Sequence, residues 1–157
     1  MRFLVADIRN TGRVEANVTV DPQTVLGTPP EFVFFKNPMS LSANAALTGS
    51  DIVVSGKIST VITYVCGRCL EEFKKPYRAE FQSVVDASNI DLREIDVSPD
   101  IKEVVMVDLP LIPTCKEDCK GLCPTCGKNR NIIQCLCVQK IENPKWDALK
   151  EFRFNKK

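Results

Sequence analysis

The sequence predicts a mainly β protein with short helices, an α+β fold, in which an antiparallel β-domain carries a cysteine-rich module and a C-terminal helix. Three observations lead to this class. Apolar and polar residues alternate over residues 41–65 and 74–85, which is the period of strands with one buried face. Six of the eight cysteines lie within residues 115–137. A helix-capping residue followed by proline occurs at residues 98 and 143, and each such pair predicts a helix start.

Length and composition limit the number of domains and the kinds of partner. The 157 residues, 44% of them hydrophobic and 26% charged, fit one globular domain with a small appended module. We expect residues 1–109 to form the β-rich domain. We expect residues 110–157 to form the module and the C-terminal helix, packed on the first part as one unit. A net charge of +1 gives no bulk attraction to nucleic acid.

The sequence predicts neither a membrane partner nor export. No run approaches the roughly 18 apolar residues of a membrane span. The first ten residues meet Asp7 and Arg9 too early for a signal peptide. A cytoplasmic location is therefore expected.

Residues 1–35 are expected to hold short β pieces separated by turns. Apolar positions alternate from Val14 to Val20, and Asp21-Pro22 is expected to end that strand. Residues 31–35 form a compact apolar piece that predicts another strand.

The clearest strand pattern follows. Residues 41–47 and 52–64 alternate on either side of a turn at residues 49–51, which predicts an antiparallel hairpin with one buried face. Gly56 lies inside the second strand and predicts a bulge or a bend. Alternation resumes at residue 74, so residues 66–69 are expected to form a knuckle at the tip of a second hairpin.

Two helices are expected in the last third of the chain. After Ser98-Pro99 the apolar residues share one helical face: Ile101, Val104, Val105 and Leu109. The run from 104 to 107 would also suit a strand. After Asn143-Pro144 a terminal helix is expected, with Trp146 and Leu149 on one face.

The eight cysteines form four closely spaced pairs: Cys66/Cys69, Cys115/Cys119, Cys123/Cys126 and Cys135/Cys137. In a reducing compartment such pairs predict metal ligands, with disulfides or buried thiols as the alternatives. Four thiolates around one ion are typical of structural zinc, so we expect about two zinc ions and a zinc-ribbon-like module. An iron–sulfur cluster is the alternative cofactor, although the spacings match neither ferredoxin pattern.

Two pairings of these cysteines are open. In the first, Cys123/Cys126 share an ion with Cys135/Cys137, and Cys66/Cys69 share the other with Cys115/Cys119. In the second, Cys66/Cys69 join Cys123/Cys126, as in many zinc ribbons, and Cys115/Cys119 join Cys135/Cys137. The sequence favours the first. Either pairing fills all four metal positions, so the metal would contribute about 10 kcal/mol per site to folding rather than catalysis.

The sequence predicts a protein that is not an enzyme and has no small-molecule substrate. It contains no histidine, the commonest catalytic base. A hydrolase would need a carboxylate cluster, and the candidates are expected to form a solvated face: Asp91, Glu94, Asp96, Asp100 and Glu103. The alternative function is a redox or metal-responsive thiol protein with a reactive pair at Cys66/Cys69.

Five basic residues near the cysteines are candidates for contacts with RNA or a protein partner: Arg68, Lys74, Lys75, Lys128 and Arg130. Such side chains on a rigid module could contact phosphates and base edges. The alternative is that they offset the charge of the thiolates or form solvated surface.

Four stretches, in the same order from residue 41 to residue 154, resemble the YceD-like family, the large-subunit ribosomal RNA accumulation proteins of bacteria and plastids. They are CGRCLEEF, VDLPLIPTCKEDC, KGLCPTCGKNRNIIQCLC and NPKWDALKEF. The resemblance implies a ribosome-assembly factor that supports accumulation or processing of large-subunit (23S) ribosomal RNA. Its implied partner is a ribosomal RNA precursor, a large-subunit ribosomal protein or an RNA-processing factor.

Overall fold

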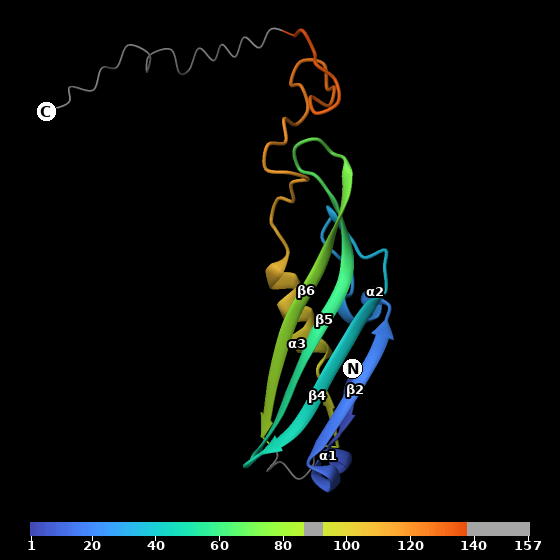
Figure 1. The fold of residues 1–157 in the computed structure, drawn as a ribbon, viewed down its shortest axis with the longest axis vertical. Helices are drawn as coiled ribbons and strands as arrows, with labels where there is room; N and C mark the ends of the chain where they lie inside the picture. Colours follow the sequence, from blue (N-terminus) through green and yellow to red (C-terminus); the bar gives the residue numbers. More distant parts are fainter. Residues whose placement is uncertain (87–92, 138–157) are drawn as a thin grey trace, which may run out of the picture.

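The computed structural model describes residues 1–86 and 93–137 (Figure 1). Within these ranges the chain is mainly antiparallel sheet with three short helices, which confirms the predicted class. The helix expected after Asn143 and the acidic residue Asp91 lie outside the described residues. The elements are β1 (Arg2–Leu4), α1 (Val5–Thr11), β2 (Arg13–Val20), α2 (Pro22–Leu26), β3 (Val33–Phe34), β4 (Met39–Thr48), β5 (Asp51–Val65), β6 (Glu72–Asp86), β7 (Glu94–Asp96) and α3 (Ser98–Asp108).

Strand β5 is the centre of a five-stranded sheet. β6 pairs with it along its whole length, from Asp51 opposite Asp86 to Val65 opposite Glu72. β4 and β3 share its other side, and β2 lies outside β4. The long strands β2, β4, β5 and β6 lie side by side in Figure 1. Both predicted hairpins are therefore present, and the 66–69 loop is at the tip of the β5–β6 hairpin. β1 and β7 form a separate two-stranded sheet.

The hydrophobic core lies between one face of the large sheet and the helices. Alternate residues of β5, among them Ile52 and Ile58, are buried there, while Lys57 between them is exposed. Helices contribute Ile8, Leu26, Ile101 and Val105 to the same core.

Gly56 lies in an unbroken ladder, so the bulge, one of the two predicted possibilities, is wrong. Its neighbours across the two ladders are Ala43 on β4 and Phe81 on β6, and the register continues on both sides. A Cβ atom placed on Gly56 would lie 2.5 Å from the Ser42 carbonyl oxygen and 2.6 Å from the Phe81 ring. Glycine is needed here because the Ser42 carbonyl and the Phe81 ring together occupy the space of a side chain.

The first 35 residues contain two helices where the sequence predicted only β pieces. Asp21-Pro22 does end a strand, as expected, but it also begins α2. The Asp21 carboxylate accepts a hydrogen bond of 3.0 Å from the Gln23 backbone N–H, and Pro22 occupies the first helical turn. The burial of Leu26 then fixes this short helix against the core.

We expect Asp21→Ala to lower the free energy of unfolding by about 1 kcal/mol, because it removes the side-chain cap of α2. Urea denaturation measures the change. Asp21→Asn keeps a capping oxygen and is expected to stay close to the unchanged protein. Equal stability of the alanine and asparagine variants would contradict the role of the cap.

Helix α3 confirms the helix predicted after residue 98 and excludes the strand alternative for residues 104–107. Its capping residue is Val97 and not Ser98. The Ser98 hydroxyl instead accepts a 2.6 Å hydrogen bond from the amino group of Met1, while Asp96 accepts one from the Ser98 backbone N–H. The chain leaves α3 toward the tip of the β5–β6 hairpin.

Candidate metal centre

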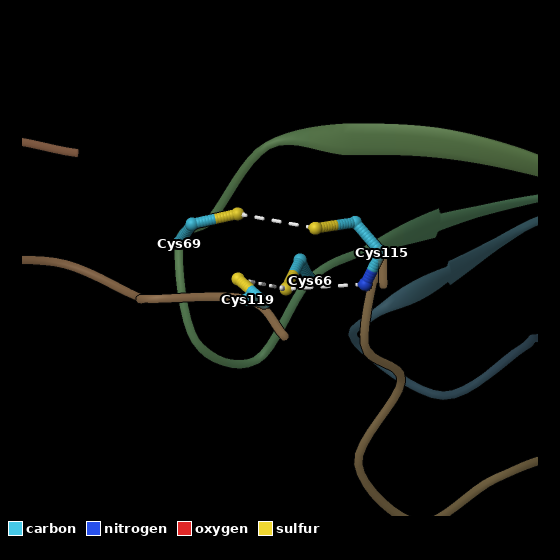
Figure 2. Close-up of side chains that lie close together, drawn as sticks. All are labelled: Cys66, Cys69, Cys115 and Cys119. Carbon is cyan, nitrogen blue, oxygen red and sulfur yellow. Dashed lines mark hydrogen bonds between the residues drawn. The ribbon is translucent and has the colours of Figure 1, made fainter. Parts of the chain in front are cut away.

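Four cysteines from two distant segments meet at the tip of the β5–β6 hairpin (Figure 2). We call this group, Cys66, Cys69, Cys115 and Cys119, the first tetrad. The sulfur of Cys66 lies 3.8 Å from that of Cys119, and the sulfur of Cys69 lies 3.7 Å from that of Cys115. All four sulfurs lie within 4.8 Å of one another.

These distances match the ligand shell of one tetrahedral ion. Zinc–sulfur bonds of about 2.3 Å place the sulfurs of a tetrahedron about 3.8 Å apart. A disulfide would need about 2.05 Å. The donor set, four sulfurs and nothing else, is that of a thiophilic metal. The first tetrad could therefore hold a metal ion.

Backbone hydrogen bonds join the two segments of the first tetrad. The Gly67 N–H donates to the Pro113 carbonyl at 2.8 Å, and the Leu122 N–H donates to the Arg68 carbonyl at 3.0 Å. The guanidinium of Arg68 also donates to the carbonyls of Glu117 and Cys119. The hairpin tip is thus held to the segment after α3 by more than the cysteines.

The backbone around the first tetrad favours a thiolate at Cys66. Burial raises the pKa of this thiol, but backbone N–H donors outweigh burial and lower the pKa to about 6. The strongest of these donors is the Cys115 N–H, 3.4 Å from the sulfur. Burial, then the neighbouring cysteines, raise the pKa of Cys115 to about 12.

The second tetrad consists of Cys123, Cys126, Cys135 and Cys137, whose sulfurs also lie within 4.8 Å of one another. Hydrogen bonds from the Cys126 and Thr125 N–H groups lower the pKa of Cys123 to about 6, against the effect of burial. The second tetrad could likewise hold a metal ion. Of the two pairings left open by the sequence, the structure has the first.

The two knuckles have the same local structure but differ at one residue. In each, the residue after the second cysteine donates its N–H to the carbonyl of the first: Leu70 to Cys66 at 2.9 Å, and Gly127 to Cys123 at 2.8 Å. Both residues have positive φ, 60° for Leu70 and 69° for Gly127. A leucine in this conformation is strained, because its Cβ crowds the following carbonyl.

We expect Leu70→Gly to raise the free energy of unfolding by about 0.5–1 kcal/mol. Relief of about 1–2 kcal/mol of strain exceeds the entropy cost of glycine, about 0.5–1 kcal/mol. Leu70 is 58% exposed, so little packing is lost. Thermal unfolding of the metal-loaded protein measures the effect. Gly127→Ala is the opposite change and is expected to destabilise, and a destabilised Leu70→Gly protein would contradict the strain.

Two asparagines support the tetrads, and their roles are visible only in the structure. The Asn131 amide donates to the Cys119 sulfur at 3.3 Å, and its oxygen accepts from the Lys120 N–H. Asn129 accepts from both the backbone and the side chain of Asn131. Asn131 lies between two ligands of the second tetrad in the chain but contacts a sulfur of the first.

The five basic candidates fall into two groups. Arg68, Lys128 and Arg130 belong to the tetrad region and are exposed, and the Arg68 carbonyl and the Arg130 N–H bond to adjoining residues there. Lys74 and Lys75 lie on β6, opposite Thr63 and Ile62. Lys75 also lines a cavity of about 260 Å³ beside Tyr77 and Pro113.

The acidic candidates that the structure describes lie on β7 and α3. Glu94 and Asp96 form ion pairs of 3.5 and 3.6 Å with Arg2, and both are about half exposed. Hydrogen bonds from Ser98 lower the pKa of Asp96. Asp100 and Glu103 follow on α3.

Comparison of the sequence with known proteins gives the family of this chain. The family described as large ribosomal RNA subunit accumulation protein YceD matches residues 54–153, a span that contains all eight cysteines. The chain belongs to the YceD family. The resemblance predicted from the sequence is therefore confirmed.

Curated relatives of this YceD-family chain include two plant proteins. An uncharacterized protein of Mycobacterium leprae is 27% identical over 79% of this chain and 66% of its own length. The large ribosomal RNA subunit accumulation protein YCED homolog 1, chloroplastic, of Zea mays is 41% identical over 29% of this chain and 16% of its own. The protein of the same name from Arabidopsis thaliana is 30% identical over 40% of this chain and 20% of its own length. The chain thus spans less than two thirds of the length of each.

No solved structure matches the chain. Among the helices of residues 1–86 and 93–137, none has the length and apolar character needed to cross a membrane.

Proposed function

We propose that this YceD-family protein is a non-enzymatic ribosome-assembly factor that supports accumulation or processing of large-subunit ribosomal RNA, with two structural zinc ions. The observation that carries the proposal is the family match over the residues that include both tetrads. The plant relatives carry the same description in their names. The proposed location is the cytoplasm, where ribosomal RNA precursors would be met.

The proposed zinc is structural because each tetrad is closed. Four thiolates complete a tetrahedral shell and leave no position for a reactive water. The sulfur separations of 3.7 and 3.8 Å favour a single ion over an iron–sulfur cluster, in which sulfide and several irons hold the cysteine sulfurs further apart. Metal analysis of the purified protein is expected to return about two zinc per chain.

In this proposal the first tetrad makes the β-domain and the module one unit. Its ligands come from residues 66–69 of the hairpin tip and residues 115–119 of the following segment. The ion would therefore fix the basic residues of the module relative to the sheet. A rigid presentation of charge favours binding, because less conformational freedom is lost when the partner arrives.

The proposed contact with ribosomal RNA uses Arg68, Lys128 and Arg130, which are exposed. Their cations could bind phosphates of a folded or single-stranded RNA. Contact through a large-subunit ribosomal protein or a processing factor is the alternative route to the same function.

Ultraviolet crosslinking of the tagged protein in cells, followed by sequencing of the bound RNA and mass spectrometry of the bound proteins, tests the proposal. We expect enrichment of large-subunit over small-subunit ribosomal RNA, and a severalfold loss in Lys128→Ala/Arg130→Ala. Lys57→Ala/Lys102→Ala removes the same charge from the outer sheet face and α3, and it should have no effect. Absence of any ribosomal component from the crosslinked material would contradict the proposal. Enrichment of ribosomal proteins without RNA would leave assembly standing and exclude direct RNA contact.

The redox alternative at Cys66/Cys69 is separated from this function by thiol titration together with metal analysis. Stoichiometric zinc with protected thiols supports the structural site. Reversible formation of a disulfide between these two cysteines in the metal-loaded protein would support the redox alternative instead.

A further inference from the structure

The two tetrads differ in the length of chain that each one closes. The first tetrad brings together cysteines that are far apart in the sequence. Cys66 and Cys119 are separated by 53 positions, and Cys69 and Cys115 by 46. The second takes all its ligands from residues 123–137. Opening the first separates the hairpin tip from the segment after α3. Opening the second requires only local rearrangement, which is a lower-energy fluctuation.

Hydrogen bonds outside the sulfurs reinforce this difference. Separation of the first tetrad also breaks the bonds from Gly67 to Pro113 and from Leu122 to Arg68. The loop of the second tetrad is held by short-range bonds, such as the one from the Cys123 N–H to the Lys128 carbonyl at 2.8 Å. The ligands of the first tetrad therefore join two distant segments, whereas those of the second lie in one loop, which contacts the first tetrad through Asn131.

Access to the sulfurs differs in the same direction. In the first tetrad three cysteines are buried, and only Cys115 is partly exposed. In the second, Cys123 alone is buried, while Cys126 is exposed and Cys135 and Cys137 are partly exposed. A chelator or an oxidant must touch a sulfur or the ion to react, so Cys126 is the accessible entry point.

We propose that the second tetrad is an exchangeable site for thiophilic ions, which loses its ion to chelators and to peroxide while the first tetrad keeps its own. This inference rests on the proposed zinc occupancy of both tetrads. The protein would then respond to zinc supply and to peroxide without losing the link between the sheet and the module.

In this proposal, hydrogen peroxide oxidises two cysteines of the second tetrad to a disulfide. The Cys126 thiolate attacks one oxygen of hydrogen peroxide, the O–O bond breaks, and a sulfenic acid and hydroxide form. A neighbouring thiolate, for which Cys123 is within reach, then displaces hydroxide from that sulfur to form a disulfide. Two thiolates are oxidised, and peroxide and two protons become two waters. A bound Zn²⁺ would lose two of its four ligands and be released.

Loss of this ion would change the structure of the loop that carries residues proposed to bind RNA. Lys128 and Arg130 lie in the loop between Cys126 and Cys135. Asn131, in the same loop, donates to the Cys119 sulfur of the first tetrad. The loop therefore connects the exchangeable site with both the retained site and the basic residues.

Zinc release from the fully loaded protein to a chromophoric chelator tests the inference. We expect two phases, one zinc per chain in each, with rates that differ on the order of tenfold or more. Cys126→Ser should lose the fast phase and keep the slow one, while Cys69→Ser, the matched change in the first tetrad, should lose the slow phase. Release of both ions at one rate, or a fast phase that survives Cys126→Ser, would overturn the inference.

A second measurement uses the unchanged protein and so does not depend on how the variants fold. Brief peroxide treatment, followed by alkylation and mass spectrometry, is expected to find the disulfide among cysteines 123–137 and unmodified thiols in the first tetrad. Earlier modification of Cys66 or Cys69 would contradict the proposal. Neither measurement involves RNA, so failure here leaves the assembly function standing, and failure of the crosslinking test leaves this inference standing.

Discussion

Cys69→Ser is expected to remove one metal ion per chain and the ordered contact between the hairpin tip and the segment after α3. A serine hydroxyl stays protonated near neutral pH and is a poor replacement for a thiolate ligand. Because metal binding is worth on the order of 10 kcal/mol per site, its loss outweighs the few backbone bonds that remain. Hydrogen exchange is the appropriate measurement, since the effect is local.

The amides of Gly67, Leu70 and Leu122 report directly on this contact, because each donates to a carbonyl across or within the knuckle. We expect their protection to fall by about 100-fold or more, which corresponds to roughly 2.8 kcal/mol of local stability. Amides of β5 near Ile58, within the core, should keep their protection from hydrogen exchange.

Cys126→Ser provides the matched control for this prediction. It removes one ligand from the second tetrad, which shares no cysteine with the hairpin tip. Gly67 and Leu122 should therefore stay protected in this variant. Protection of these amides in Cys69→Ser, or equal loss in both variants, would contradict the role assigned to the first tetrad.

The strands could be predicted because burial of one sheet face leaves a period-two pattern in the sequence. The alternation of β5 indicated both its length and its inward face, and the hairpin tip at residues 66–69 followed from it. Short helices left no such pattern. Asp21-Pro22 signals a strand end and a helix start equally well, and only the burial of Leu26 against distant residues decides that α2 forms.

The cysteine pairs could be predicted from spacing, but the pairing of the pairs depended on tertiary structure. A C-x2-C knuckle fixes two sulfurs locally, and the spacing favoured the observed pairing without excluding the crossed one. That choice is made by the β5–β6 register and by the path from α3, which bring Cys115 to the hairpin tip. The role of Asn131 could not be predicted for the same reason, since its hydrogen bond to Cys119 connects the loop of the second tetrad to the first tetrad.

Gly56→Ala is the second change expected to have a large effect, with a loss of about 2–3 kcal/mol in the free energy of unfolding. The added methyl group would lie 2.5 Å from the Ser42 carbonyl oxygen and 2.6 Å from the Phe81 ring. The carbonyl belongs to β4, which is paired on both sides, so it can move only by distorting the sheet. The ring is 3% exposed and packed in the core. Urea denaturation measures the loss.

Ser55→Ala is the matched control, because Ser55 is the exposed neighbour of Gly56 on the same strand, and its change should stay within about 0.5 kcal/mol. The decisive variant is the double change Gly56→Ala/Phe81→Leu. If the ring is what excludes a side chain at residue 56, its removal makes room for the methyl group, and the double variant should be more stable than the sum of the single changes by about 1 kcal/mol. Additive losses would mean that the Ser42 carbonyl alone requires the glycine. A non-additive result would show that the Phe81 ring occupies the space of the missing side chain. From the sequence alone, a glycine in such a position predicts a bulge.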